Sequence, residues 1–331
     1  MSVKRIFTVD SHTMGESTRV IIGGMPIIKG NTMAEKRDYM MNNLDHIRKT
    51  LMLEPRGHQN MFGSIIVEPC NPKADLGVIF MDGGGYLNMC GHGSIGTITA
   101  AVETGIVSPN KKGLVYMDTA AGLIEAFVQM QGGRVKSVSF KNIESFLYKK
   151  DLELEVDGLK FNYDISFGGS FFALVAAKDV GLEIEAKNAV KFLKLGLKIR
   201  DKINNTVEIQ HPSLKHIKTV DLVEFYDHQN SDGCDYKNTV VFGKAQVDRS
   251  PCGTGTCAKM AALYKRGEMK KGESIVNRSI LGTDFKGKIY DILKFKGYDA
   301  IIPQITASAY IYGYNQIIID DHDPLKAGFL L

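Results

Sequence analysis

The chain has 331 residues, of which 44% are hydrophobic and 24% are charged, and its formal net charge is only +4. These values predict a packed soluble protein of two domains, because a single core rarely grows beyond about 250 to 300 residues. Lysines and arginines are scattered without a basic stripe, and no run reaches the roughly 18 apolar residues of a membrane span, so neither nucleic acid nor membrane is expected as a partner.

The N-terminal stretch MSVKRIFTVDSHT lacks the apolar core of a secretory signal. The chain has five cysteines, and an odd number in a long chain argues against a framework of disulfides. Both observations favour a cytoplasmic protein whose cysteines are free thiols.

The hydrophobic pattern predicts a mixed α/β fold. A helix is expected from about 32 to 51, where Thr32 and Glu35 have capping-box spacing and apolar residues recur on one face. The stretch AFVQMQGGRVKSVSF then predicts a hairpin that turns at Gly132-Gly133.

A second hairpin is predicted by LELEVDGLKFNYDI, in which two alternating strands flank a turn at Asp157-Gly158. A second long helix is expected near 188 to 203, with an apolar side formed by Phe192, Leu195, Ile199 and Ile203.

Two short stretches, MCGHG and PCGTG, indicate an internal repeat. When Cys90 is placed on Cys252, the alignment continues without gaps for sixteen residues and ends with Gly105 on Gly267, both suited to end a short helix. A weaker similarity relates DSHTMG, near the N-terminus, to DISFGG in the second half. We therefore expect two duplicated, pseudo-symmetric lobes.

The lobe boundary is expected near Lys149 to Asp151. This gives an N-terminal lobe of residues 1–148 and a C-terminal lobe of residues 149–317. The last segment, about 318–331, is expected to return to the first lobe.

Cys90 and Cys252 each directly precede a predicted helix. The free N–H groups and the dipole of a helix N-terminus stabilise an anion, so they can lower the pKa of a thiol or bind a carboxylate. If the lobes face each other, one thiolate can remove a proton from a carbon acid while the opposite thiol protonates the other face. This chemistry inverts a Cα centre.

Other uses of the cysteines stay open at this point. Buried cysteines are commonly small hydrophobic residues, and Cys257, in the second short helix, is interpreted as packing. Cys70 and Cys234 are interpreted as packing or loop positions, with Cys234 expected to be exposed. Cys90 and Cys252 could also serve a thiol redox or metal-binding protein without turnover, in which Cys252 and Cys257 form a C-x4-C pair and Cys90 with His92 adds ligands. No second C-x-x-C-type pair supports a structural zinc site, so no metal is expected.

The stretches MDGGGYLNMCGHGSIG and VDRSPCGTGT resemble the two signature motifs of the proline racemase family, and the similarity extends over nearly the whole chain. The resemblance implies the fold of the wider superfamily that includes diaminopimelate epimerase, in which each lobe wraps a curved sheet around a central helix. It also implies an isomerase that racemises or epimerises its substrate without a cofactor, and a homodimer.

The resemblance assigns roles to individual residues. It implies that Cys90 and Cys252 are the two acid/base thiols. Backbone N–H groups would bind the substrate carboxylate, His92 and Asp248 would contact the ring nitrogen, and two aromatic residues would pack against the pyrrolidine ring. The backbone N–H groups are those of Gly91, His92, Gly253 and Thr254. The two aromatic residues are Phe62 and Phe242.

The expected reaction is the interconversion of L- and D-proline. The main alternative is 4-hydroxyproline 2-epimerisation, which uses the same chemistry in a more polar pocket. Phe62, where hydroxyproline-specific relatives often have a tyrosine, favours proline. Dehydratases of trans-3-hydroxyproline typically have threonine at the second catalytic position, so Cys252 argues against that activity. Cys257 departs from the family pattern, because relatives often have serine or alanine there.

Overall fold

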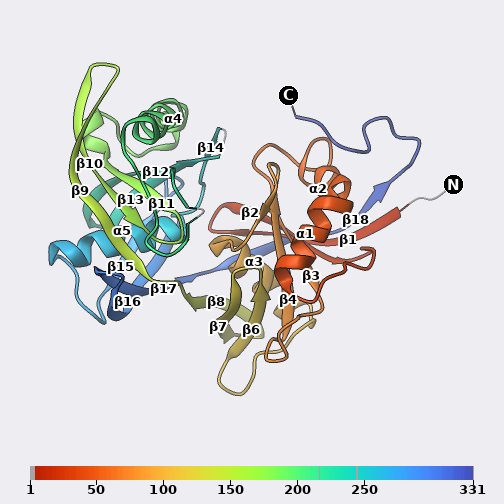
Figure 1. Ribbon diagram of the computed structural model, residues 1–331. Coiled ribbons are helices and arrows are strands. Elements are labelled where there is room, and N and C mark those ends of the chain that lie inside the picture. Colours follow the sequence, from red (N-terminus) through yellow and green to blue (C-terminus); the bar gives the residue numbers. More distant parts are fainter. Residues whose placement is uncertain (1–3, 216, 244, 331) are drawn as a thin grey trace. The chain divides into compact units, whose positions relative to one another are not determined.

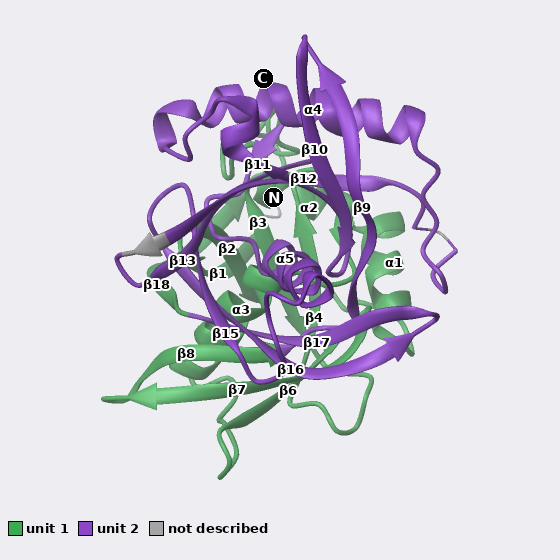
Figure 2. Cartoon of the chain, turned by 90° about the vertical axis from the view of Figure 1, so that its left-hand side faces the viewer, with its two compact units in different colours: residues 1–140, 308–331 green, residues 141–307 purple. Residues whose placement is uncertain are grey.

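The computed structural model describes residues 4–215, 217–243 and 245–330. The chain divides into two compact units (Figure 1, Figure 2): residues 1–140 with 308–331 form unit 1, and residues 141–307 form unit 2. Both limits lie earlier than the sequence placed them. The reason is that β9 (Ser145–Val156) pairs within unit 2, while β18 (Ala309–Ile319) pairs along its length with β1 (Lys4–Thr13) of unit 1.

Unit 1 is a mixed sheet with helices. In pairing order from β1, the strands are β2 (Glu16–Gly23), β3 (Phe62–Val67), β4 (Leu76–Asp82), β6 (Leu114–Thr119), β7 (Gly122–Gln131) and β8 (Arg134–Lys141), with short β5 (Tyr86–Leu87) beside β4. The pairs β2–β3 and β4–β6 are parallel and the others antiparallel. The helices are α1 (Met33–Asn43), α2 (Asp45–Met52) and α3 (Gly91–Glu103).

Unit 2 repeats this plan. From β9, the strands pair in the order β10 (Leu159–Phe167), β11 (Phe171–Ala176), β12 (Val220–Ser231), β13 (Cys234–Phe242), β15 (Ser274–Arg278), β16 (Asp284–Phe295) and β17 (Tyr298–Ala307), with short β14 (Gln246–Val247) beside β13. β17 also pairs with β9, so the strands close into a ring. The helices are α4 (Ala189–Thr206) and α5 (Gly253–Arg266), with 3-10 turns at Ala177–Val180 and Ala186–Asn188.

The order of strand pairings confirms the predicted duplication. Each unit begins with a hairpin, which is followed by helical structure and by a strand that pairs in parallel with the hairpin's second strand. An antiparallel strand, a short strand and the central helix come next. The strand after the central helix pairs in parallel with that antiparallel strand, and a hairpin follows. The mixed α/β fold with two pseudo-symmetric lobes is therefore confirmed. α3 and α5 occupy the same place in the two patterns.

Each unit buries its central helix against its own strands. α3 contacts β1, β2, β3 and β18, and every residue from His92 to Ala101 is buried. α5 contacts β9, β10, β11, β16 and β17, and Figure 2 shows it inside the ring of unit 2. Because each central helix contacts several strands of its own unit, those strands position the residues at its N-terminus.

The predicted hairpins and the second long helix are confirmed. Val156 pairs with Leu159 around the Asp-Gly turn, and Gln131 pairs with Arg134 around the Gly-Gly turn. α4 buries Phe192, Ile199 and Ile203, while Leu195 is half-buried.

The helix predicted from 32 to 51 is broken in two at Leu44, so the prediction of one continuous helix is wrong. Thr32 caps α1 as expected, with its hydroxyl accepting from the Glu35 N–H at 3.1 Å. Leu44 leaves helical geometry, with φ −129° and ψ 14°. The apolar pattern continues through this break because α1 and α2 both pack on the same core of unit 1.

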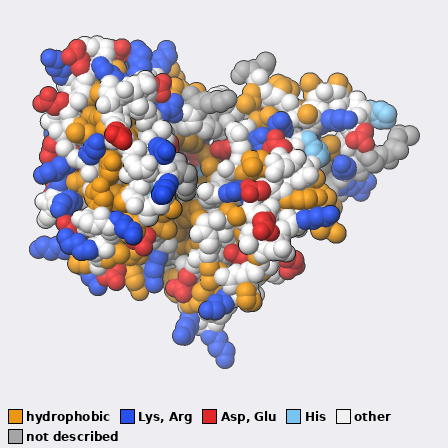
Figure 3. Space-filling view, viewed as in Figure 1, with side chains coloured by type: hydrophobic (Ala, Val, Ile, Leu, Met, Phe, Trp, Pro, Cys, Tyr) orange, Lys and Arg blue, Asp and Glu red, His pale blue; other side chains and the backbone are white. Residues whose placement is uncertain are grey.

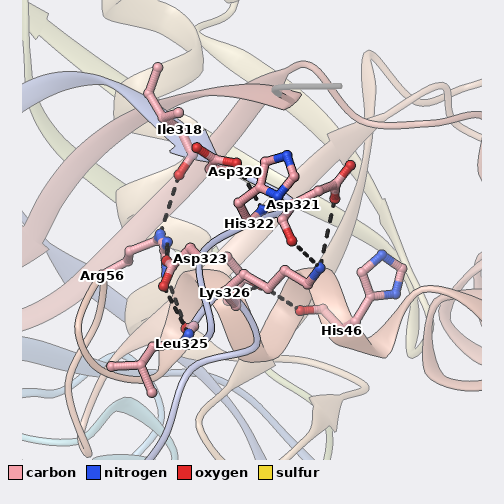
Figure 4. A network of polar contacts seen from close by, with 10 residues as sticks. His46, Arg56, Ile318, Asp320, Asp321, His322, Asp323, Leu325 and Lys326 are labelled. Atoms are coloured by element: carbon pink, nitrogen blue, oxygen red, sulfur yellow. Dashed lines mark hydrogen bonds and ion pairs between the residues drawn. The ribbon is translucent and has the colours of Figure 1, made fainter. Parts of the chain in front are cut away.

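The C-terminal segment, residues 318–330, makes polar contacts with α2 and with the loop after it (Figure 4). The Arg56 side chain forms an ion pair with Asp323 and donates to the Ile318 carbonyl at 3.3 Å. The Thr50 hydroxyl donates to the Lys326 carbonyl at 2.6 Å, and Glu54 forms a β-bridge with Phe329. These contacts explain why the chain end belongs to unit 1.

Positive and negative side chains are interspersed on the face shown in Figure 3. Within the part of the chain that the structure describes, no helix has the length and apolar character to span a membrane.

Candidate active site

The two repeated cysteines are the N-cap residues of the central helices. Cys90 precedes α3 and Cys252 precedes α5, and both side chains are buried. Their backbones differ: Cys90 is extended at φ −142°, whereas Cys252 has φ +60°, in the left-handed region that a non-glycine residue adopts at a cost of about 1–3 kcal/mol. The second turn therefore has a more strained backbone conformation than the first.

In unit 1, Cys90 lies against His92 and Phe62. The Cys90 Sγ is 3.5 Å from Nδ1 of His92, and the ring of Phe62 meets the imidazole edge-on at a centroid distance of 4.5 Å. The Thr13 hydroxyl donates to the His92 carbonyl at 2.8 Å, which fixes the first turn of α3 to β1. Gly91, which follows Cys90 in the sequence, is the first residue of α3, so its N–H is one of the free N–H groups at the helix N-terminus.

Burial lowers the pKa of His92 to about 3, although a backbone contact at Ser17 opposes the shift. The imidazole is therefore neutral near pH 7. It can donate or accept one hydrogen bond beside the Cys90 thiol, but it does not form an imidazolium–thiolate ion pair.

In unit 2, Cys252 is held by a short polar chain. Asp248 accepts from the N–H and the hydroxyl of Ser250, each at 2.8 Å, and the Ser250 Oγ accepts from the Cys252 N–H at 3.2 Å. The Cys252 Sγ accepts from the Gly255 N–H at 3.4 Å and lies 3.7 Å from the hydroxyl of Thr254. Thr254 thus takes the place in unit 2 that His92 has in unit 1.

Burial raises the pKa of Cys252 well above its usual value, and the negative charges of Asp248 and Glu224 raise it further. The Gly255 N–H and the Thr254 hydroxyl oppose this shift. A helix N-terminus alone favours the thiolate, as the sequence suggested, but here desolvation and two nearby carboxylates outweigh it. Desolvation and these two carboxylates therefore favour the thiol form of Cys252.

The structure brings the expected site residues together in two groups, one in each unit. Unit 1 contributes Cys90, Gly91, His92 and Phe62, and unit 2 contributes Cys252, Gly253, Thr254 and Asp248. Phe242 is half-buried at the end of β13. Val240, two residues before Phe242 on the same strand, accepts a hydrogen bond from the Asp248 N–H at 2.8 Å. This contact links the end of β13 to the site in unit 2.

The remaining cysteines are separate from the two N-caps. Cys257 is fully buried on α5, and burial raises its pKa to about 12, which agrees with the interpretation as packing. Cys70 is half-buried in the loop between β3 and β4. The expectation that Cys234 is exposed is wrong: it lies on β13, and its thiol donates to the Tyr236 carbonyl at 3.0 Å.

Sequence reasoning missed two kinds of residue around the thiols. Ser250 lies inside the second motif, where its position between Asp248 and Cys252 was the available signal. Glu224, whose charge acts on Cys252, and Lys259, whose charge acts on Glu224, are both buried in unit 2. The only signal for Glu224 was a carboxylate at an inward position of the alternating strand VDLVEFY.

The family model described as "Proline racemase" matches residues 8–330. The chain belongs to the proline racemase family. A relative named "Proline racemase" from Clostridioides difficile is 54% identical over 330 residues, covering 99% of this chain and 98% of the relative. Another of the same name from Acetoanaerobium sticklandii is 55% identical over 329 residues and covers 98% of each chain.

A solved structure agrees with the fold. A hydroxyproline epimerase from Agrobacterium vitis, determined with bound trans-4-hydroxy-L-proline, is 32% identical and superposes with a TM-score of 0.89, covering 99% of this chain and 95% of that one. The family match therefore rests on the whole chain rather than on the two motifs alone.

Proposed function

We propose that this protein is a cofactor-independent racemase that interconverts L- and D-proline with two cysteine thiols as acid and base. The observation that carries the proposal is the repeated placement of a cysteine as the N-cap of each buried central helix. The proposal is also supported by a relative named "Proline racemase", which is 54% identical to this chain over nearly the full length of both.

The reaction requires the two N-caps to face one another across the substrate. A thiolate takes the Cα proton from one face while the opposite thiol gives its proton to the other face, so the two sulfurs exchange protonation states and no net proton is consumed. The carboxylate of the substrate would lie between the two helix N-termini. The N–H groups of Gly91, His92, Gly253 and Thr254 would then stabilise negative charge as it spreads onto the carboxylate oxygens.

The side chains around the thiols fit proline. The carboxylate of Asp248 can pair with the secondary ammonium of the ring, and neutral His92 can accept a hydrogen bond from it. Phe62 and Phe242 would pack against the ring methylenes. A secondary amine cannot form the ordinary imine of pyridoxal chemistry, and a two-thiol route does not need one. A homodimer stays a prediction of the family resemblance, and a cytoplasmic location stays a prediction of the N-terminal stretch and the cysteine count.

We expect the enzyme to favour proline over trans-4-hydroxy-L-proline by roughly tenfold to a hundredfold in kcat/KM, since burying an unpaired hydroxyl against aromatic carbon costs about 1–3 kcal/mol. The measurement is chiral chromatography of both reactions, run side by side on one preparation with L-alanine as the unreactive control. A preference for the hydroxylated substrate would assign the chain to 4-hydroxyproline epimerisation, and no turnover of either would reject the proposal.

Pyrrole-2-carboxylate should inhibit competitively and bind more tightly than proline, because its carboxylate-bearing carbon is already planar like the transition state. The gain should be modest, since it lacks the cationic nitrogen that pairs with Asp248. It should also protect Cys90 and Cys252 from iodoacetamide while leaving half-buried Cys70 unprotected, as judged by peptide mass spectrometry. Protection of only one N-cap thiol, or of neither, would show that the two do not share a pocket.

A further inference from the structure

The peptide group between Pro251 and Cys252 is held by hydrogen bonds at both of its ends. Its N–H donates to the Ser250 Oγ at 3.2 Å. Its carbonyl oxygen accepts from the Nδ2 of Asn238, on β13, at 2.7 Å, and from the hydroxyl of Thr256, on α5, at 3.3 Å. These contacts restrict the rotation of the peptide group that precedes the second thiol.

Two asparagines donate toward the Pro251 carbonyl from the strands. Asn238 and Asn277 are both fully buried, and they lie on the paired strands β13 and β15. The Asn277 Nδ2 donates to the Thr256 hydroxyl at 2.9 Å and to the Pro251 carbonyl at 3.5 Å. A carbonyl oxygen only accepts, so the amide nitrogens, and not the amide oxygens, face Pro251. We call Asn238 and Asn277 the amide clamp.

Glu224 fixes the direction of the Asn238 amide. Its Oε1 accepts from the Asn238 Nδ2 at 3.0 Å, so the two hydrogens of this nitrogen are divided between Glu224 and Pro251. Burial raises the pKa of Glu224, which favours the neutral acid. A protonated carboxyl group still has an oxygen that accepts, so the amide clamp requires no charge on Glu224.

The amide clamp acts on the torsion angle that directs the second thiol. Cys252 has φ +60°, and this angle sets its side chain relative to the preceding peptide group. On the other side of its Cα, the Cys252 carbonyl accepts from the Thr256 N–H at 2.9 Å. A left-handed φ at a residue with a side chain persists only where the surrounding structure over-determines it. With both flanking peptide groups held, the direction of the Cα–Cβ bond of Cys252 is set.

Unit 1 has apolar residues at the positions of the two asparagines. The strand registers of the repeat match Asn238 of β13 to Val78 of β4. They match Asn277 of β15 to Met117 of β6 in the same way. Both side chains are buried and have no hydrogen-bond donor. Cys90, in the corresponding turn, is extended at φ −142°, so the two amides occur in the unit whose cysteine has the left-handed φ.

We propose that Asn238 and Asn277 are positioning residues for the second thiol, which hold the Pro251 carbonyl and thereby keep Cys252 in the conformation that directs its Sγ toward the substrate Cα. The inference rests on the proposed function, because it names what aligns one of the two sulfurs. A misplacement of about 1 Å can lower a rate about a hundredfold. Loss of the amide clamp should therefore slow the step that uses Cys252 and leave substrate binding in place.

The deciding variant is Asn238→Leu, which keeps approximately the size of the side chain, removes the donor and adds no charge beside Glu224. Its kcat for proline should fall about tenfold to a hundredfold, while KM changes less than about threefold. Asn277→Leu should act in the same direction with a smaller effect, because its contact with Pro251 is longer. Thr239→Val is the matched control on β13, since this buried hydroxyl has no hydrogen-bond partner among the described residues, and it should leave both constants unchanged.

Exchange of the Cα proton with deuterated water separates positioning from general damage to the fold. In Asn238→Leu, the enantiomer whose proton Cys252 removes should lose exchange by the same factor as kcat, whereas the enantiomer whose proton Cys90 removes should keep its exchange. A purely structural role would slow the exchange of both enantiomers equally, and that result, or an unchanged kcat, would overturn the proposal. If Asn238→Leu does not fold, Asn277→Leu decides by the same comparison.

Labelling with iodoacetamide tests the amide clamp without turnover. Cys252 is 6% exposed, and a turn released from the clamp can open. In Asn238→Leu, its alkylation relative to Cys70 in the same molecules should rise about fivefold, the factor that one hydrogen bond contributes to a local opening. Unchanged labelling in an enzyme that racemises proline would reject only this inference. Increased labelling in a protein whose wild type does not racemise proline would reject only the proposed activity.

Discussion

Cys90→Ser and Cys252→Ser should each lower the rate of proline racemisation by about a hundredfold to ten-thousandfold, the range that a positioned acid or base contributes. A serine hydroxyl keeps the size of the side chain but is a far weaker acid than a thiol, so it can neither hold the negative charge nor release the proton. Because the mechanism needs both sulfurs in every turnover, either variant alone should lose both directions of the reaction.

The measurement is the approach to racemic proline from each pure enantiomer by chiral chromatography. Cys257→Ser is the matched control: this thiol is buried on α5 five residues after Cys252, and its replacement should leave most of the activity. Full activity in either N-cap variant would reject the two-thiol mechanism. Exchange of the Cα proton with deuterated water should survive for one enantiomer in each variant, because one sulfur is still present.

The fold was predictable from the sequence wherever local signals and the repeat agreed. The Asp-Gly and Gly-Gly turns fixed two hairpins, because their neighbours alternate between buried and exposed sides. The shared Cys-Gly-x-Gly turns located both central helices. The break at Leu44 was not predictable, because the apolar spacing runs through it and only packing on the core of unit 1 separates α1 from α2.

The candidate site was predictable to the extent that it is local in the sequence. His92, Thr254 and Asp248 lie within four residues of a cysteine and were found with it. Glu224 and Lys259 come from a strand and from the middle of a helix, and their positions in the sequence do not show that Glu224 lies near Cys252. The direction of the Cys252 pKa shift depends on the burial of Cys252, so the helix terminus alone predicted the opposite direction.

Arg19→Ala should lower the free energy of unfolding of unit 1 by about 3–5 kcal/mol, the cost of leaving a buried charge without its partner. The Arg19 guanidinium makes a two-pronged contact with Asp10, with Nε at 3.1 Å from both carboxylate oxygens and Nη2 at 2.8 Å from one. It also donates to the Leu51 carbonyl at 2.8 Å and to that of Arg56. The substitution therefore leaves the buried Asp10 carboxylate with the Thr8 hydroxyl as its remaining donor, at 3.0 Å, and removes the donor of backbone carbonyls in α2 and the loop after it.

The repeat provides the matched control for this prediction. Asp164, which corresponds to Asp10, pairs with Arg266 at 2.8 Å, but the Arg266 side chain is 31% exposed, against 10% for Arg19. Asp164 is also buried, but it keeps the Asp151 N–H as a donor at 2.9 Å and its arginine is the more exposed of the two, so Arg266→Ala should cost less, about 1–3 kcal/mol. Urea unfolding followed by circular dichroism suits a chain without tryptophan. An equal loss of unfolding free energy in the two variants would contradict the prediction. It would mean that neither the burial of Arg19 nor its contacts with α2 add to the stability that the ion pair provides.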